Sequence, residues 1–367
     1  MSKSRLHELY EHGQSVWLDY LSRTLIHTGK LAKMMDEDAV VGVTSNPTIF
    51  QKAIAEGDAY DEQLKELLER EDDLREIFLE LSAVDIRDAC QLLRSVWDST
   101  DGTDGYVSWE VDPDLAMDRD ATFEQAKRLH EWMAEPNLYV KIPATKPGVG
   151  AIEDSIAEGR NINVTLIFSL QRHEEVMEAY LRGLERFAES GGDLSNIQGV
   201  ASFFVSRVDT EADRRLDEAG HPELKGKLAI ANAKLAYQNY KRVFAGERWE
   251  QLAAKGAHPQ RCLWASTSTK NPDYRDVMYV EELIGTDTVN TMPEETIRAF
   301  QDHGVVADTL AQGIDEAKQL FNDLRAAGVD YDDVSETLER EGVQKFSDSF
   351  KELLDGIRAK RDVLAAA

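Results

Sequence analysis

Three ionisable residues stand inside apolar, strand-like runs of this sequence, where an aliphatic side chain would be the ordinary choice. Lys141 lies within Leu-Tyr-Val-Lys-Ile-Pro, Asp19 within Val-Trp-Leu-Asp-Tyr-Leu and Glu110 within Val-Ser-Trp-Glu-Val. A buried lysine must be paired or lose its proton, and a neutral amine is a nucleophile towards ketones. The plain alternative is a strand-end lysine that extends its charge into water. An amine and two carboxylates on separate strands favour instead a set of acid/base groups that meet in one site.

The elements that must position these groups follow a regular order. Short β-branched runs alternate with longer segments of helical period, which is typical of a β/α fold with a parallel sheet. Eight strands, the number that closes a β/α barrel, are expected at residues 15–20, 39–44, 106–111, 138–143, 163–168, 198–205, 262–266 and 286–290. Amphipathic helices are expected between them at residues 73–97, 122–133, 172–188 and 224–244. Pro293 and the two glutamates after it predict the first turn of a helix behind the eighth strand.

The predicted fold class is therefore α/β, a single (β/α)8 TIM barrel with extra C-terminal helices. We expect residues 1–367 to form one domain, because barrels routinely exceed the average domain length and no linker marks a boundary. Residues 329–367 are expected to form a helical C-terminal extension packed on the barrel. Their apolar positions recur at helical spacing, at Val334, Leu338, Val343, Phe346, Phe350 and Leu353.

In a barrel of this kind the reactive groups stand at the carboxyl ends of the strands. The polar residues that fall late in their expected strands, or directly after them, are Asp19, Asn46, Glu110, Lys141, Asn163, Ser202 and Ser266. We expect these side chains to converge on one mouth of the barrel.

Charge and composition exclude several partner classes. The chain has 42 Lys+Arg against 69 Asp+Glu, a net charge of -27, which repels nucleic acid and anionic membranes. No stretch approaches the roughly 18 to 20 apolar residues of a membrane span. The N-terminus lacks the apolar core of a secretory signal, and two cysteines form no disulfide framework. We expect a cytoplasmic protein that binds an anionic substrate only in a local basic pocket, and the apolar helix faces leave room for a homo-oligomer.

Three segments carry a family resemblance. Residues 42–50, Gly-Val-Thr-Ser-Asn-Pro-Thr-Ile-Phe, resemble the Thr-Ser/Thr-Asn-Pro segment of transaldolases. Residues 139–145, Tyr-Val-Lys-Ile-Pro-Ala-Thr, resemble the Schiff-base lysine motif of that family, and residues 163–169, Asn-Val-Thr-Leu-Ile-Phe-Ser, resemble its following strand. Their order, spacing and strand placement agree from about residue 17 to residue 292.

The resemblance implies a class I aldolase on a β/α barrel, without metal or cofactor. Such an enzyme moves a dihydroxyacetone unit from sedoheptulose 7-phosphate or fructose 6-phosphate to glyceraldehyde 3-phosphate or erythrose 4-phosphate. By resemblance, Lys141 attacks the C2 carbonyl of the donor and forms an imine. Asp19 takes and returns the C4 hydroxyl proton, and Glu110, with Thr165, holds the water that moves protons while the imine forms and hydrolyses.

The resemblance also implies substrate-binding residues, all near strand ends: Asn46, Asn163, Ser202, Phe204, Arg207, Ser266 and Lys270. Each asparagine suits the neutral hydroxyls of the dihydroxyacetone unit, although a turn or cap is the plain alternative for either.

A phosphate site is expected after the sixth and seventh strands. Arg207 offers a guanidinium that matches phosphate geometry, and Ser266 corresponds to the serine of the family's site. The family often has an arginine two residues after that serine, whereas this chain has Ser268. We expect Lys270 to supply the charge, against the alternative of a solvated loop lysine.

Three other functions compete with transfer. A fructose 6-phosphate aldolase would release dihydroxyacetone, but Phe204 stands where a tyrosine can position water in that sister family. A non-catalytic sugar-phosphate binding protein would have lost part of the set Asp19, Glu110 and Lys141. A metal-dependent enzyme would need ligand spacing such as His-Glu-x-x-His or Cys-x-x-Cys, which the eight histidines and two cysteines do not supply.

Overall fold

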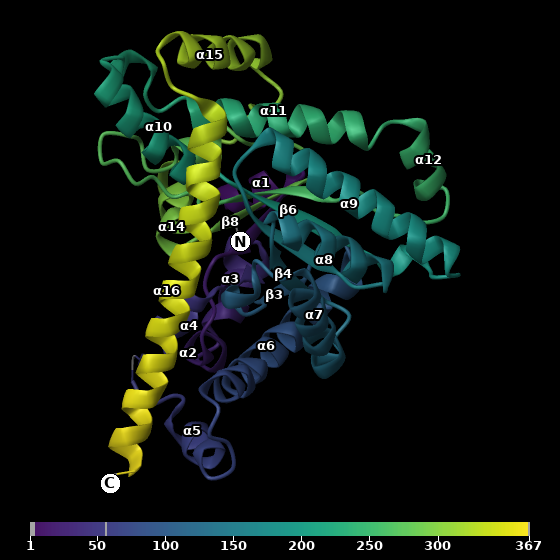
Figure 1. The fold of residues 1–367 in the computed structure, drawn as a ribbon, viewed down its shortest axis with the longest axis vertical. Coiled ribbons are helices and arrows are strands. Elements are labelled where there is room, and N and C mark those ends of the chain that lie inside the picture. Colours follow the sequence, from purple (N-terminus) through teal and green to yellow (C-terminus); the bar gives the residue numbers. More distant parts are fainter. Residues whose placement is uncertain (1–3, 56, 366–367) are drawn as a thin grey trace.

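Eight parallel strands close into a barrel in the computed structural model, which describes residues 4–55 and 57–365 (Figure 1). Each strand pairs with the next in the chain, and the eighth pairs with the first. The strands are β1 (Gln14–Leu18), β2 (Val40–Thr44), β3 (Tyr106–Glu110), β4 (Leu138–Pro143), β5 (Ile162–Ile167), β6 (Gly199–Phe204), β7 (Arg261–Ala265) and β8 (Thr288–Met292). Every strand residue is buried, as expected of a parallel sheet covered by helices. The predicted (β/α)8 fold is confirmed.

Helices surround the barrel. They are α1 (Arg5–Glu11), α2 (Arg23–His27), α3 (Lys30–Asp38), α4 (Pro47–Ala55), α5 (Asp61–Leu68), α6 (Leu74–Ser99), α7 (Arg119–Met133), α8 (Lys146–Ala157), α9 (Leu170–Glu189), α10 (Ser206–Ala219), α11 (Leu228–Val243), α12 (Glu247–Ala253), α13 (Met278–Glu281), α14 (Glu294–His303), α15 (Ile314–Ala326) and α16 (Tyr331–Ala365). Side-chain caps set several starts, such as Asp118 before α7, Thr145 before α8 and Ser169 before α9.

Among the predicted boundaries that were wrong, three have a local physical cause. The eighth strand starts two residues late because Asp287 adopts a left-handed φ of 56° before it. The helix expected at 224–244 starts at Leu228, because Gly226, with a φ of 70°, separates α11 from a short 3-10 turn. Pro293 is the N-cap of α14 and not its first helical residue.

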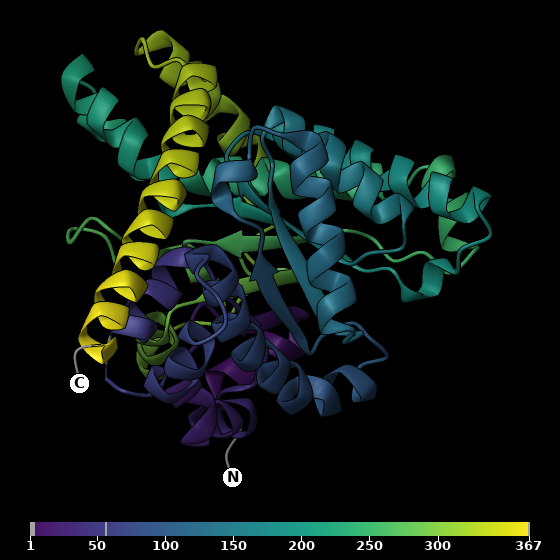
Figure 2. The same ribbon diagram turned by 60° about the horizontal axis from the view of Figure 1, so that its bottom comes forward.

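Residues Tyr331–Ala365 form one continuous helix, α16, where the sequence predicts a helical extension made of further helices. Figures 1 and 2 show it running along one side of the molecule, and it packs against α4, α5, α6 and α10. The division into one domain with a C-terminal extension stays a prediction.

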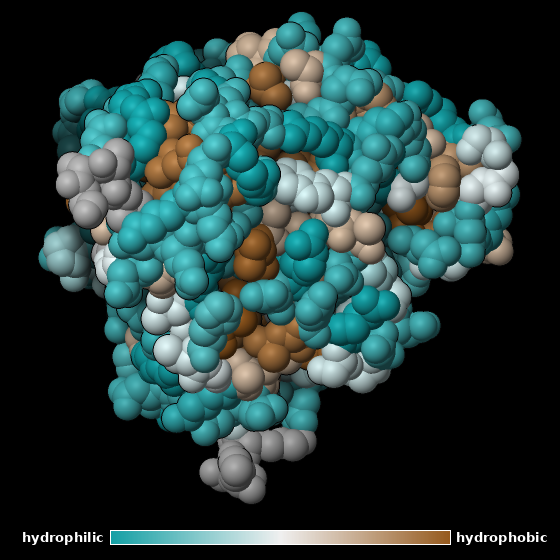
Figure 3. Space-filling view, turned by 90° about the horizontal axis from the view of Figure 1, so that it is seen from below, coloured by the Kyte–Doolittle hydropathy of each residue, from teal (hydrophilic) through white to brown (hydrophobic). Residues whose placement is uncertain are grey.

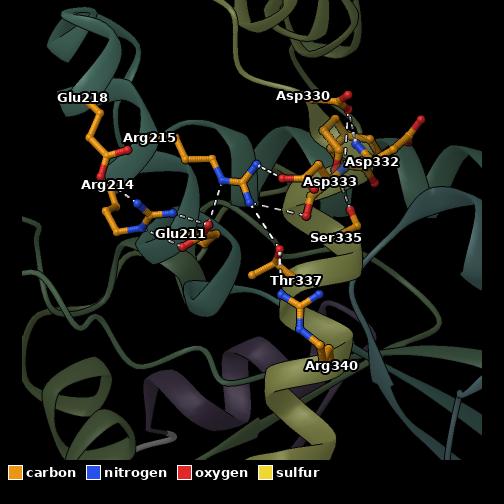
Figure 4. Close-up of polar contacts among 11 residues, drawn as sticks. Glu211, Arg214, Arg215, Glu218, Asp330, Asp332, Asp333, Ser335, Thr337 and Arg340 are labelled. Carbon is orange, nitrogen blue, oxygen red and sulfur yellow. Dashed lines mark hydrogen bonds and ion pairs between the residues drawn. The ribbon is translucent and has the colours of Figure 1, made fainter.

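Arg215 of α10 fastens the beginning of α16 (Figure 4). Its guanidinium pairs with the Asp333 carboxylate and donates to Thr337 Oγ1 at 3.3 Å. Its Nε also donates to Glu211 Oε1 at 2.7 Å within α10. An arginine shared among three acceptors fixes the geometry better than an isolated surface ion pair does.

A glycine lets α16 approach the barrel mouth closely. A Cβ added at Gly342 would lie 3.1 Å from Cδ2 of Leu166 in β5, tighter than ordinary van der Waals contact. Leu166 itself has a φ of 59°, a conformation that non-glycine residues adopt at a cost of about 1 to 3 kcal/mol. This strain falls where the β5–β6 register shifts.

A buried ion pair closes the opposite, amino-terminal end of the barrel. Arg261 of β7 donates to Asp104 Oδ1 at 3.0 Å and to Ser15 Oγ at 3.0 Å. Ser15 Oγ and Trp17 Nε1 both donate to Asp104 as well. The charge pair is thus fully hydrogen-bonded, which a buried pair requires.

The outer surface matches the acidic composition. On the face seen in Figure 3, hydrophilic residues dominate and hydrophobic residues gather only in small patches. Within residues 4–55 and 57–365, no helix is long and apolar enough to cross a membrane.

Candidate active site

The carboxyl ends of the strands open into a cavity of about 340 Å³. Most of the predicted site residues line it: Asp19, Asn46, Lys141, Thr165, Ser202, Phe204, Arg207, Ser266 and Lys270. The other two, Glu110 and Asn163, do not line this cavity but contact residues that do. The barrel therefore brings together side chains that are far apart in the sequence.

Lys141 is a buried amine with an acidic neighbour. Its side chain projects from β4, and the residue is 5% exposed. Its Nζ donates to the Ser45 carbonyl oxygen at 3.2 Å and lies 3.5 Å from Glu110 Oε2. Strand register explains the pair, because Lys141 is the direct partner of Glu110 across β3 and β4.

Burial raises the pKa of the Glu110 carboxyl. Removal from water raises the pKa of its carboxyl to about 7, and the Lys141 charge opposes that rise. Glu110 Oε2 has no hydrogen-bond partner within the described residues. A carboxyl with a pKa near neutrality, held beside the Lys141 amine, is suited to exchange protons with a reacting group.

Thr165 presents a hydroxyl oxygen to the cavity. The residue is fully buried on β5, and its Oγ1 has no partner in the part of the chain that the structure describes. A buried hydroxyl left unpaired costs about 1 to 3 kcal/mol. A water molecule or a substrate hydroxyl in the cavity would satisfy it.

Asp19 follows β1 directly and is partly exposed to the cavity. Its backbone N–H donates to the Met292 carbonyl at 2.8 Å, which continues the β1–β8 pairing past the strand end. The Thr44 hydroxyl donates to Asp19 Oδ1 at 2.8 Å, and Thr44 Oγ1 lies 2.7 Å from Thr291 Oγ1. Thr44 of β2, supported by Thr291 of β8, thus holds this carboxylate in place.

The sequence predicts that Asn163 binds substrate, but in the structure Asn163 does not line this cavity. It is fully buried, it donates to Ser108 Oγ at 3.0 Å, and its Oδ1 accepts from Ser202 Oγ at 2.7 Å. Asn163 is also the strand partner of Lys141. Its observed contacts therefore link Ser202 and β3 beside the lysine.

Asn46 both caps a helix and lines the cavity, the two alternatives that the sequence left open. Its Oδ1 accepts from the Ile49 N–H at 3.0 Å at the start of α4, and the residue also lines the cavity. The cap fixes the loop that carries the neighbouring Ser45 carbonyl towards Lys141.

Arg207 places a guanidinium in the cavity wall. Burial lowers the pKa of its guanidinium, which the Asp19 and Glu110 charges partly oppose. Its Nη1 is buried without a hydrogen-bond partner among residues 4–55 and 57–365. It stands in the first turn of α10, a helix without a side-chain cap, so backbone N–H groups and the guanidinium favour an anion at the same place.

The loop after β7 completes this polar end. Ser266 has a φ of 56°, and its Oγ lies 2.9 Å from Ser206 Oγ at the start of α10. Lys270 Nζ donates to Ser268 Oγ at 2.6 Å, and burial lowers the pKa of Lys270. The loop lysine therefore lines the cavity while the residue as a whole remains exposed.

Phe204 supplies an apolar wall at the end of β6. Its ring lies 5.2 Å from the ring of Phe168, and the Arg207 guanidinium lies 5.1 Å from the Phe204 ring centroid. The residue is 6% exposed and lines the cavity.

Sequence reasoning missed several cavity residues. The most notable is Phe346 of α16, whose ring centroid lies 5.9 Å from Lys141 Nζ. Lys52 of α4 and Glu295 of α14 also line the cavity. The helical period placed Phe346 on the apolar side of its helix, but no local signal indicated which element that side would face.

Comparisons with known proteins agree over nearly the whole chain. The family Transaldolase/Fructose-6-phosphate aldolase matches residues 16–357. The chain is 53% identical to a transaldolase of Frankia alni over 356 residues, 96% of each protein. It is 51% identical over 365 residues to one of Acidothermus cellulolyticus, covering 97% of this chain and 98% of that protein. A transaldolase of Mycobacterium ulcerans is 51% identical over 368 residues, 99% of each. With a buried lysine, two carboxylates and an unpaired arginine at the barrel mouth, the chain belongs to the transaldolase/fructose-6-phosphate aldolase family.

Proposed function

We propose that the chain acts as a transaldolase on sugar phosphates through a Schiff base on Lys141. The chain is an enzyme, a transferase, and curated relatives that bear the name transaldolase support this function. The donor is sedoheptulose 7-phosphate or fructose 6-phosphate, and the acceptor is glyceraldehyde 3-phosphate or erythrose 4-phosphate. The observation that carries the proposal is the Lys141 amine, buried beside Glu110 in a cavity that Asp19 and Arg207 also line.

The chemistry begins with addition of the neutral Lys141 amine to the donor's C2 carbonyl. The resulting carbinolamine loses water to give an imine, and the nitrogen carries a positive charge once protonated. Glu110 moves protons to and from the departing water, assisted by a water that Thr165 holds. The 3.5 Å contact of Glu110 Oε2 with Lys141 Nζ supports this assignment, as does Thr165 Oγ1, which has no hydrogen-bond partner among the described residues.

Cleavage then depends on Asp19. Its carboxylate takes the C4 hydroxyl proton while the C3–C4 bond breaks, the aldose phosphate leaves, and the bond electrons pass into the enamine at the Lys141 nitrogen. The acceptor aldehyde is attacked by the same carbon, and Asp19 returns the proton to the new hydroxyl. Hydrolysis of the imine frees the lysine. Arg207, Ser266 and Lys270 hold the phosphate, and Asn46, with the Asn163–Ser202 pair, orients the dihydroxyacetone unit.

A second candidate is release of dihydroxyacetone, as in a fructose 6-phosphate aldolase, which shares the family. Release needs a proton delivered to the enamine before an aldehyde arrives. The Phe204 ring has no hydroxyl to position water for that step, which favours transfer.

The proposed function is tested by reduction with borohydride in the presence of fructose 6-phosphate, followed by peptide mass analysis. We expect the adduct on the Lys141 peptide, none in Lys141→Met, and an unchanged adduct in the control Lys146→Met. Turnover should require erythrose 4-phosphate. An adduct with dihydroxyacetone released equally well without acceptor would identify the aldolase, and an absence of adduct would favour a binding protein.

The proposal also includes the partners, the location and the oligomeric state of the protein. The net charge of -27 argues against nucleic acid as a partner, whereas the local cations Arg207 and Lys270 in the cavity support small sugar phosphates. We also propose a cytoplasmic location and leave a homo-oligomer as a prediction for measurement of the mass in solution.

A further inference from the structure

The C-terminal helix contributes a wall to the reactive end of the barrel. Phe346 of α16 is 6% exposed and lines the cavity, with its ring centroid 5.9 Å from the Nζ of Lys141. A cation within about 6 Å of an aromatic centroid, over the ring face, is attracted by the ring quadrupole. The nitrogen that would react therefore has an aromatic face beside it.

Several contacts hold α16 so that this ring keeps its place. Thr48 Oγ1 donates to Ser349 Oγ at 2.8 Å, which joins α4 to the helix one turn beyond Phe346. Gly342 permits the close approach to Leu166, one turn before it. Arg215 fixes the beginning of the helix to α10 through Asp333 and Thr337 (Figure 4).

The ring matters more once the imine has formed. The lysine ammonium has three N–H donors, and the Ser45 carbonyl and Glu110 already lie 3.2 Å and 3.5 Å from it. A protonated imine nitrogen keeps one N–H and so cannot serve both partners. An aromatic face needs no N–H, and the substrate that fills the cavity displaces the water that would otherwise solvate the charge.

We propose that Phe346 stabilises the protonated Lys141 imine by presenting its ring face to the nitrogen, so that α16 is a working part of the active site. This inference rests on the proposed Schiff-base function. It predicts that the ring, and not merely apolar bulk, determines how much imine accumulates. The positive nitrogen is also the group that accepts the electrons of the broken C3–C4 bond, so a smaller imine population lowers turnover.

The test compares Phe346→Leu, Phe346→Met and Phe346→Tyr at one subsaturating concentration of fructose 6-phosphate. Leucine and methionine keep apolar volume without the ring, whereas tyrosine keeps the ring. We expect the borohydride-trapped fraction of Lys141 to fall about 5- to 30-fold in the leucine and methionine variants, which corresponds to about 1 to 2 kcal/mol. The tyrosine variant should trap within about twofold of the wild-type fraction, because the cation–π contact remains.

Leu353→Ala is the matched control. Leu353 is buried on the same helix, two turns after Phe346, and does not line the cavity. Its truncation weakens the packing of α16 but should leave the trapped fraction unchanged, so a loss in that variant would show that docking alone explains the effect. Near-ultraviolet circular dichroism reports whether each variant keeps its packed aromatic residues.

Two results would overturn the inference. The first is equal trapping in wild type and in both ringless variants, and the second is a loss in the tyrosine variant as large as that in leucine. Absence of any Lys141 adduct in the wild-type protein would instead overturn the proposed function. The two failures are therefore distinguishable in one experiment.

Discussion

Glu110 Oε2 lies 3.5 Å from Lys141 Nζ, and both residues are almost fully buried. In this pair the Lys141 charge opposes the rise that burial causes in the pKa of the Glu110 carboxyl. The pair also joins neighbouring strands at one level of the barrel, since the residues are partners in the β3–β4 register.

The first prediction concerns pH. Because burial raises the pKa of Glu110 to about 7, its carboxylate is lost as the pH falls through that value. A step that needs the carboxylate slows in the same range, so kcat/KM should decline below about pH 7. Glu110→Gln should lower kcat by roughly 10²- to 10⁴-fold and remove the acid limb from the pH profile. If the glutamine variant still showed the decline of kcat/KM below about pH 7, that decline would belong to another ionisable group.

The second prediction concerns the phosphate. Arg207→Ala removes the unpaired guanidinium, and hydrogen bonds to charged groups contribute about 1.5 to 3 kcal/mol. We therefore expect kcat/KM for fructose 6-phosphate to fall about 10- to 150-fold, while that for unphosphorylated fructose changes little. Arg214→Ala is the control, because Arg214 lies on the same helix but pairs with Glu211 and Glu218 on the surface. Equal losses for both sugars would argue against a phosphate contact.

The third prediction concerns the choice between transfer and release. Phe204→Tyr places a hydroxyl in the cavity wall, where it can position water near the enamine. The rate of dihydroxyacetone release without acceptor should rise, and the transfer rate with erythrose 4-phosphate should drop. Both are measured with a coupled assay. Release that stays at the wild-type rate would sink this explanation.

The fourth prediction concerns the far end of the barrel. Asp104→Asn leaves the buried Arg261 charge without its counter-ion, and breaking such a pair costs about 3 to 5 kcal/mol. The free energy of unfolding in urea should drop by that amount, while kcat changes little because the pair is at the end opposite the site. For comparison, Glu218→Gln should cost no more than about 1 kcal/mol, since its pair with Arg214 is exposed. Similar losses in the two variants would contradict the structural role of Asp104.

The barrel and much of the site could be predicted because their signals are local. Each strand appears as a short buried run, and parallel strands in a barrel deliver their carboxyl ends to one mouth. Lys141 and Asp19 could be placed there from strand position alone, without knowledge of packing, whereas Arg207 was predicted through the family resemblance. The eighth strand was misplaced by two residues because the left-handed turn at Asp287 is not evident from an aspartate by itself.

Contacts between distant elements could not be predicted in the same way. Phe346 fits the helical period, but its position over Lys141 depends on Gly342, Ser349 and Arg215 acting together across the fold. The hydrogen bonds of Asn163 likewise depend on the register of three strands. Such pairings leave no trace in a single sequence beyond the polar or apolar type of each residue.

The position of Phe346 in α16 also has a consequence for biosynthesis. A ribosome makes the strands that carry Asp19, Glu110 and Lys141 long before it reaches residue 346. The eight strands can thus be complete in a nascent chain before the Phe346 ring exists, which leaves the amine open to solvent and to stray carbonyl compounds. A premature stop codon between residues 292 and 346 would give a chain that contains Asp19, Glu110 and Lys141 but lacks the Phe346 ring beside the lysine.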